Sequence, residues 1–229
     1  MIQSLKTPAR YERSVAEYLN TFDGVKAERP TVGSKYPDVF VEYKGKTSWI
    51  EVKMNEEDQL GTPRVMFNGE RWVSKDSPVQ NFTCDVLNSS EQATQFVKDL
   101  KSLGSVIPTT KGGLKDPAAV PVEAMTEFLS DRKQYVCEID NVDLGDLVAK
   151  HYNFGKTEPA HYIQTGDQFF SLGENPFNLP LPSLSGKGIF KVRIGVRTDF
   201  YEVLPEIKIR GELYSPYSVA HGTLKPHPF

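Results

Sequence analysis

Near the start of the chain, hydrophobic residues recur every three or four positions, as they do along one side of an α-helix. The side chains that share this stripe are Tyr11, Val15, Tyr18, Leu19 and Phe22. Thr7 and Pro8 precede the stripe, and both residue types are favoured where a helix begins. We therefore predict a helix from about residue 7 to residue 20, with its apolar stripe against the core. Glu12 lies at the border of the stripe, so we expect its carboxylate at the edge of the core.

The pattern changes to that of β-strands after residue 36. Residues 36–43 and 47–54 are rich in β-branched and aromatic side chains, and a break that contains a glycine separates them. This arrangement predicts a β-hairpin. If its loop consists of Lys44 and Gly45, the pairing places Asp38 opposite Glu51, with Cβ atoms about 5 Å apart.

The rest of the chain predicts a mixture of short helices and strands. We expect irregular structure at 56–79 and a surface loop at 105–121, helices at 90–103, 122–129 and 144–152, a hairpin at 162–172, and strands at 134–139, 188–197 and 201–210. We interpret the aromatic residues of the segment 152–170 as core packing. The sequence contains neither a repeat nor a long polar linker, so we expect a single domain over residues 1–229. The predicted fold class is α/β, with a mixed central sheet flanked by helices and extra strand-rich elements in the C-terminal half.

The composition is that of an ordinary globular protein. The 229 residues include 27 Lys and Arg against 30 Asp and Glu, for a formal net charge of −3. This balance argues against a polybasic protein, and the apolar runs are too short for a membrane span or for the core of a signal peptide. Cys84 and Cys137 are isolated, which argues against a disulfide framework or a paired-cysteine zinc site. We therefore expect a cytoplasmic protein that binds neither a membrane nor an organic cofactor.

Three polar residues of the predicted hairpin carry the candidate chemistry. Glu51 and Lys53 lie two positions apart on one strand, so both project to the same face. Asp38, opposite Glu51, brings a second carboxylate into the same small volume. Two carboxylates this close raise each other's pKa unless a cation lies between them. Mg²⁺ prefers oxygen ligands and often uses only one or two protein carboxylates, so Asp38, Glu51 and the backbone carbonyl of Val52 suit it.

Bound Mg²⁺ would polarise a phosphate group and lower the pKa of a bound water. Lys53, beside it, is expected to position or deprotonate that water and to neutralise charge in the transition state. The alternative interpretation is an ordinary turn aspartate next to a solvent-facing charge pair. Trp49 shares the face of Glu51 and Lys53, which favours a partly covered face and hence the first interpretation.

This segment resembles the active-site motif of the PD-(D/E)XK nuclease superfamily. Pro37-Asp38 matches the first half of the motif, and Glu51-Val52-Lys53 matches the second half. The family also has an N-terminal helix that often contributes a glutamate, and Glu12 matches that place. The resemblance covers roughly residues 7–60 and implies a restriction endonuclease-like sheet, with Mg²⁺ as cofactor and Mn²⁺ as a substitute. It implies catalytic roles for Glu12, Asp38, Glu51 and Lys53, and metal ligation by Glu12, Asp38, Glu51 and the Val52 carbonyl.

The residues before the motif also look like those of archaeal-type Holliday junction resolvases, which place an arginine and a serine ahead of it. By that resemblance Arg29 and Ser34 become candidate phosphate contacts. Basic and amide side chains around the hairpin would neutralise phosphates and contact base edges. The remaining candidate DNA-binding residues are Lys35, Asn55, Gln59, Arg64, Arg71 and Lys111.

These expectations combine into a Mg²⁺-dependent DNA endonuclease of restriction, phage or recombination type, in the cytoplasm of a prokaryotic or phage-infected cell. The C-terminal half would elaborate the sheet and substrate recognition. DNA is the expected partner, and a homodimer is the simplest way for one site per chain to cut both strands. Two alternatives stay open: a non-catalytic nucleic-acid-binding or interaction module that retains the nuclease fold, and an RNA-cleaving nuclease.

Overall fold

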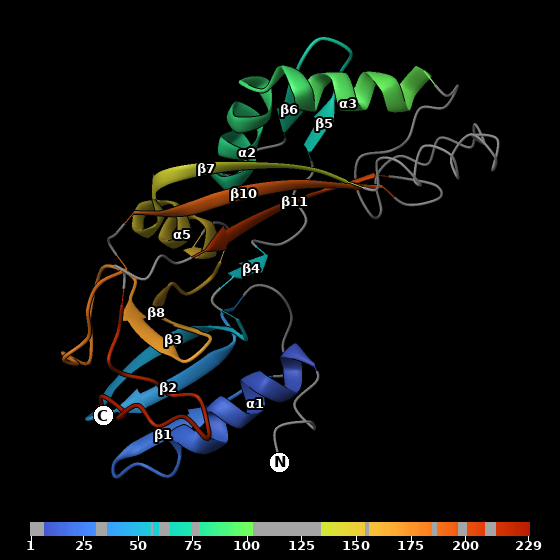
Figure 1. The fold of residues 1–229 in the computed structure, drawn as a ribbon. Helices are drawn as coiled ribbons and strands as arrows, with labels where there is room; N and C mark the ends of the chain where they lie inside the picture. Colours follow the sequence, from blue (N-terminus) through green and yellow to red (C-terminus); the bar gives the residue numbers. More distant parts are fainter. Residues whose placement is uncertain are drawn as a thin grey trace. The chain divides into compact units, whose positions relative to one another are not determined.

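The computed structural model describes residues 7–30, 36–55, 57–59, 65–74, 78–102, 134–153, 156–184, 187–196, 201–208 and 214–229. Within these ranges the fold is mixed α/β, with a five-stranded, a four-stranded and a two-stranded sheet (Figure 1). The predicted fold class, α/β with a mixed sheet, is confirmed. The chain divides into two compact units, one of Met1–Asp58, Asp143–Gly188 and Ile209–Phe229, the other of Gln59–Val142 and Ile189–Lys208.

The first unit is built on the five-stranded sheet, in the order β1-β2-β3-β8-β9. Its strands are β1 (Val25–Glu28), β2 (Val39–Tyr43), β3 (Lys46–Lys53), β8 (Ala160–Thr165) and β9 (Gln168–Ser171). Strands β3 and β8 are parallel, and the other neighbours are antiparallel. The predicted N-terminal helix is confirmed as α1 (Pro8–Leu19), which contacts β1 and β2. The predicted helix at 144–152 is confirmed as α5 (Leu144–Asn153), which contacts β8.

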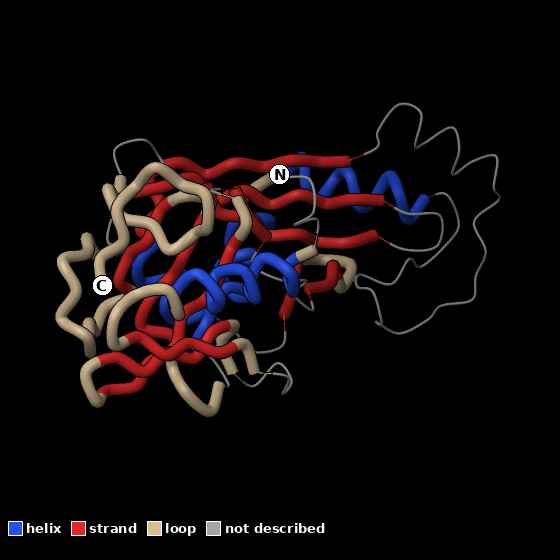
Figure 2. Tube along the Cα trace, turned by 90° about the horizontal axis from the view of Figure 1, so that it is seen from below, coloured by secondary structure: helices blue, strands red, loops and turns tan. Residues whose placement is uncertain are grey.

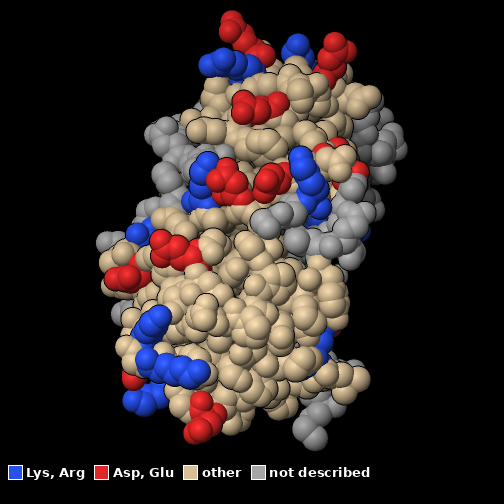
Figure 3. Space-filling view, turned by 90° about the vertical axis from the view of Figure 1, so that its left-hand side faces the viewer, with Lys and Arg blue, Asp and Glu red and all other residues tan. Residues whose placement is uncertain are grey.

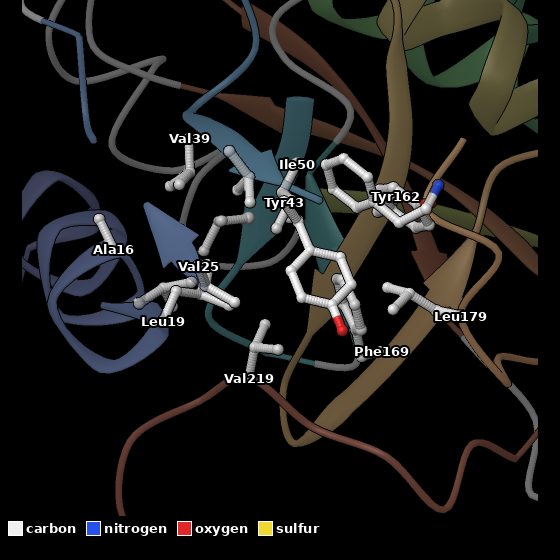
Figure 4. Close-up of a cluster of buried hydrophobic side chains, with 14 residues drawn as sticks. Ala16, Leu19, Val25, Val39, Tyr43, Ile50, Tyr162, Phe169, Leu179 and Val219 are labelled. Carbon is white, nitrogen blue, oxygen red and sulfur yellow. The ribbon is translucent and has the colours of Figure 1, made fainter. Parts of the chain in front are cut away.

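The core of this unit lies between α1 and one face of the sheet. Val15 and Leu19 of α1 are fully buried, as the predicted stripe requires. They pack in one cluster with side chains of the sheet, among them Val39, Ile50 and Tyr162 (Figure 4). Residues 214–229 contain neither helix nor strand (Figure 2), yet they complete this core, because Val219 is fully buried in the same cluster.

The predicted hairpin is confirmed, and its loop explains its register. Lys44 and Gly45 form a two-residue loop with φ of 50° and 72°, the left-handed pair that matches the twist of the strands. Tyr43 then pairs with Lys46, and the pairing continues to Val39 and Ile50. The next positions along this register are Asp38 and Glu51, as the sequence predicts.

The remaining sheets and helices belong mainly to the second unit. A four-stranded sheet has the order β4-β11-β10-β7, and β5 pairs with β6. The elements are β4 (Glu57–Gln59), β5 (Val65–Phe67), β6 (Trp72–Ser74), α2 (Pro78–Asn88), α3 (Glu91–Ser102), β7 (Gln134–Asp143), β10 (Lys187–Val196) and β11 (Tyr201–Lys208). None of the helices described here is long and apolar enough to cross a membrane.

Most predicted elements of the second unit are confirmed, but the described residues of 56–79 include regular structure. The predicted helix at 90–103 and the strands at 134–139, 188–197 and 201–210 correspond to α3, β7, β10 and β11. The prediction for 56–79 was wrong, because β4, β5, β6 and the start of α2 lie there. Strands of three residues are too short for an alternating pattern to emerge. The predicted loop at 105–121 and helix at 122–129 lie outside the described residues.

Candidate functional site

Asp38, Glu51 and Lys53 come together on the face of the sheet opposite the core of the first unit. Glu51 and Lys53 lie at the end of β3, and the Nζ atom of Lys53 is 2.9 Å from Oε1 of Glu51. The Glu51 side chain is only 7% exposed and that of Lys53 19%. Asp38 precedes β2, and its carboxyl group lies close enough to that of Glu51 for the charge of Glu51 to raise the pKa of Asp38. The three residues that carry the predicted chemistry therefore form one largely buried group.

Local geometry fixes Asp38 at this place. The backbone N–H of Val52 donates a hydrogen bond of 2.9 Å to Oδ2 of Asp38. This bond lies just beyond Val39 and Ile50, the last paired residues of the hairpin. Pro37, which is buried, has no N–H of its own to donate, and β2 begins only after Asp38. The Asp38 side chain thus continues the hydrogen bonding of the hairpin.

Burial and the neighbouring carboxylate change the acidity of Asp38. Burial raises the pKa of Asp38, the charge of Glu51 raises it further, and Lys53 and the Val52 N–H lower it, for a result of about 7. Part of this rise comes from repulsion between the two neighbouring carboxyl groups, and this repulsion gives the pair a strong electrostatic preference for a cation beside it.

The same surroundings keep Lys53 in its charged form. Burial acts to lower the pKa of Lys53, but negative charge on Tyr152, Glu51 and Asp38 acts to raise it, and the net pKa is raised. Tyr152 is charged only as a phenolate, so near pH 7 the carboxylates are the groups that keep Lys53 protonated. The Nζ atom also lies 5.0 Å from the centre of the Tyr152 ring, a cation–π contact. Lys53 is therefore a fixed positive charge, which fits charge neutralisation and not deprotonation of a water.

One oxygen of this group is left without a hydrogen bond. Atom Oε2 of Glu51 is buried and has no hydrogen-bond partner among the residues that the structure describes. A buried polar atom without a partner costs roughly 1–3 kcal/mol, and more when it is charged. A divalent cation with oxygen ligands would satisfy this atom, so Asp38 and Glu51 fit the predicted Mg²⁺. The carbonyl of Val52 as a third ligand stays a prediction.

Glu12 has a different partner. It lies on α1 with 13% of its side chain exposed, and its Oε2 accepts a hydrogen bond from Nε of Arg29 in an ion pair. In the described part of the chain, no group of three or more His, Cys, Asp or Glu side chains is arranged to hold a metal ion. The structure therefore brings together Asp38 and Glu51 and does not add Glu12 to them. Its predicted catalytic role stays a prediction, as does phosphate binding by Arg29.

The predicted DNA-binding residues that the structure describes belong to both units. Asn55 is exposed just after β3, and its carbonyl accepts a hydrogen bond of 2.8 Å from Oγ1 of Thr165. Arg71 is exposed in the turn between β5 and β6 of the second unit. Acidic and basic side chains are intermingled on the face drawn in Figure 3. The positions of Ser34, Lys35, Arg64 and Lys111, and the side chain of Gln59, lie outside the described part of the chain.

Helix α5 contributes residues that the sequence did not assign to the site. Tyr152, interpreted from the sequence as packing, is buried and also contacts Lys53. Next to it, Nδ1 of His151 is buried and has no hydrogen-bond partner within the described residues. Burial lowers the pKa of His151 to about 4, helped by the charges of Lys53 and Lys156, so the ring is neutral. Helical spacing of buried Leu144, Val148 and Tyr152 would have identified the inner face of α5, but not what lies beneath it.

Comparisons with protein families, with curated proteins and with solved structures gave no match for this chain. The resemblance to PD-(D/E)XK nucleases therefore rests on the residues of the motif, and its functional meaning rests on the geometry described above.

Proposed function

We propose that this protein is a Mg²⁺-dependent nuclease that hydrolyses phosphodiester bonds in DNA. The observation that carries the proposal is the pair of half-buried Asp38 and buried Glu51. One oxygen of Glu51 has no hydrogen-bond partner among the described residues, and the ammonium of Lys53 lies 2.9 Å from the other. This combination places a cation site and a fixed positive charge next to each other.

Asp38 and Glu51 would hold the cation, with the Val52 carbonyl as a further ligand. When bound, Mg²⁺ supplies polarisation of the phosphate and a water of lowered pKa. The protein's own contribution is to keep both carboxylates in place: the Val52 N–H holds Asp38, and the strand geometry of β3 fixes Glu51. Their low exposure excludes most of the solvent, which strengthens the electrostatic attraction for a cation.

Lys53 would neutralise the negative charge that develops on the phosphate. Its ammonium is protonated at neutral pH because its pKa is raised, and Glu51 and Tyr152 fix its direction. A preorganised charge of this kind stabilises the transition state without reorganisation during the reaction. Deprotonation of the attacking water is left to another group or to solvent.

An ordinary surface charge pair would not have these properties. Exposed ion pairs contribute at most about 1 kcal/mol and keep their oxygens hydrated. Here Glu51 is 5% exposed, its Oε2 atom lacks a partner among the described residues, and the pKa of Asp38 is raised to about 7. Each of these features destabilises the folded protein. A functional role therefore explains them better than a structural role does.

The proposal is tested by incubating the purified protein with supercoiled, linear, branched and single-stranded DNA and with RNA of matched sequence, in Mg²⁺ and in EDTA. We expect cleavage of DNA only with Mg²⁺. Asp38→Asn, Glu51→Gln and Lys53→Met should each lower the rate by at least about 100-fold. Glu42→Gln is the matched control, since Glu42 lies on the same hairpin but is exposed and paired with Lys26.

Absence of wild-type cleavage on all of these substrates would contradict the proposal, as would equal cleavage by wild type and Asp38→Asn. Cleavage of RNA in preference to DNA would support the assignment of the site but would show that the substrate is RNA. Salt-sensitive DNA binding without hydrolysis would instead support the non-catalytic module.

A further inference from the structure

Three aromatic rings lie beside the carboxylate pair. Tyr36 stacks on Trp49, with ring centroids 5.3 Å apart, and Phe40 meets Trp49 edge-on at 5.1 Å. We call Tyr36, Phe40 and Trp49 the aromatic cluster. Phe40 and Trp49 are direct cross-strand partners in the hairpin. Asp38 and Glu51 occupy the next position on the same face, two residues further along each strand, which is about 7 Å.

The aromatic cluster differs from the rings on the core face of the same sheet. Tyr162 and Phe169 on the core face have no exposed surface, whereas each ring of the aromatic cluster remains partly exposed. Core packing therefore accounts for the first group and only in part for the second. Lys156 adds a positive charge at the edge of the cluster, since its Nζ donates a hydrogen bond of 3.0 Å to the carbonyl of Tyr36.

We propose that the aromatic cluster is a subsite for one unstacked nucleobase next to the scissile phosphate. The inference rests on the proposed nuclease function and specifies its substrate. Every base has a π-face that stacks on aromatic side chains, so such a subsite binds without sequence preference. Lys53, and the cation that the adjacent carboxylates would hold, recognise the phosphate, and the rings recognise the base.

This arrangement selects against intact duplex. A paired base has both faces covered by its neighbours, and exposing one costs unstacking and unpairing energy. Single-stranded, frayed or branched DNA offers a free base face without that cost. We therefore expect the nuclease to prefer a strand that is unpaired next to the cut.

Tryptophan fluorescence tests the subsite directly, because the chain has only two tryptophans and Trp72 is 1% exposed. The protein is full-length Asp38→Asn in EDTA, so neither cleavage nor a metal enters the measurement. The probes are a short oligothymidylate, an abasic oligonucleotide of the same length and charge, and a perfect duplex. We expect strong quenching of the Trp49 fluorescence by the oligothymidylate. The abasic strand and the duplex should each quench it much less than the oligothymidylate does. Adding Trp49→Phe should remove the quenching but keep the affinity within a few fold.

Adding Trp49→Leu should weaken oligothymidylate binding, measured by anisotropy of a labelled strand, by about tenfold. If this variant does not fold, the comparison of Trp49→Phe with its parent Asp38→Asn still tests the subsite.

Equal binding of oligothymidylate and abasic strand, or quenching that persists in Trp49→Phe, would overturn the subsite and leave the nuclease proposal to the cleavage assay. Equal quenching by the duplex would overturn the requirement for an unpaired base. Base-dependent quenching together with absence of cleavage by wild type would support base binding and overturn the nuclease proposal alone.

Discussion

The two faces of the five-stranded sheet are built on opposite physical rules. The core face carries Val39, Ile50 and Val52, which are apolar, buried and packed against α1. The other face of the same hairpin carries buried Glu51 and half-buried Asp38, whose carboxyl groups are close together and only partly compensated. The alternation of a β-strand lets neighbouring residues serve both purposes. Burial of apolar side chains on the core face stabilises the fold. This stabilisation offsets the cost of holding two carboxyl groups close together on the other face.

Removing a core side chain should have the largest effect on stability. Ile50→Ala replaces a residue with no exposed surface and leaves a cavity, so the free energy of unfolding should fall by about 2–5 kcal/mol. Urea unfolding followed by tryptophan fluorescence measures this change. Thr47→Ala, exposed on the same strand, is the control and should change stability by less than about 0.5 kcal/mol. Equal effects of the two variants would contradict the assignment of the core face.

On the other face, removing a charge should stabilise the protein, and the gain should depend on pH. The pKa of Asp38 is about 7 in the folded protein against an ordinary value of 3.8, so the folded state binds the extra proton. The contribution of Asp38 to stability is therefore most favourable below about pH 4 and is lost as the pH rises towards 7. Asp38→Asn removes this loss, so the difference in unfolding free energy between the variant and wild type should grow from pH 5 to pH 8, by up to about 3 kcal/mol.

Unfolding of wild type and Asp38→Asn at several pH values between 5 and 8 measures this difference. Mn²⁺ or Mg²⁺ at pH 8 should raise the melting temperature of wild type and not that of Asp38→Asn, because a ligand that binds the folded state stabilises it. A constant difference between the two proteins across this pH range would show that Asp38 does not titrate as described.

A smaller effect is expected where α5 covers the site. Tyr152→Leu removes the ring that lies over Lys53, and loss of the cation–π contact should lower the cleavage rate by about 2- to 30-fold. Tyr152→Phe keeps the ring and should restore most of the rate, whereas a purely structural role of the hydroxyl would not allow this rescue. The comparison of kcat and KM for the two variants checks it, with loss expected in kcat because Lys53 acts in the transition state.

The smallest effect is expected for a carboxylate that lies on the hairpin but outside the site. Glu42 is exposed and pairs with exposed Lys26 at 3.5 Å. Glu42→Gln should leave the cleavage rate within about twofold of wild type. It should change the free energy of unfolding by no more than about 0.5 kcal/mol. A larger loss of activity would extend the functional surface along β2, away from Asp38.

The sequence predicted those parts of this arrangement that depend on local structure. The loop of Lys44 and Gly45 determines the register, and the register determines which side chains face each other, so the pairing of Asp38 with Glu51 followed from short-range rules. Helix α1 was predictable for the same reason, because its stripe and first turn lie within 15 residues of sequence.

Contacts between distant segments could not be predicted in this way. Strand β8 pairs in parallel with β3 across more than 100 residues, and this pairing carries α5 and Tyr152 to the site. The pattern of α5 indicates a buried face but not its partner. Likewise, the spacing of Glu12 and Arg29 gave no sign that they would form an ion pair with each other. Strand β1 has only four residues, and tertiary pairing with β2 decides its conformation more than its own pattern does.

The most direct test of the cation site is anomalous diffraction from crystals of the wild-type protein grown with Mn²⁺ at pH 8, which is above the pKa of Asp38. We expect a metal peak between Asp38 and Glu51, within coordination distance of both, and its loss in Asp38→Asn crystals prepared in the same way. A wild-type map without a peak at these carboxylates, or an equal peak in Asp38→Asn, would contradict the site.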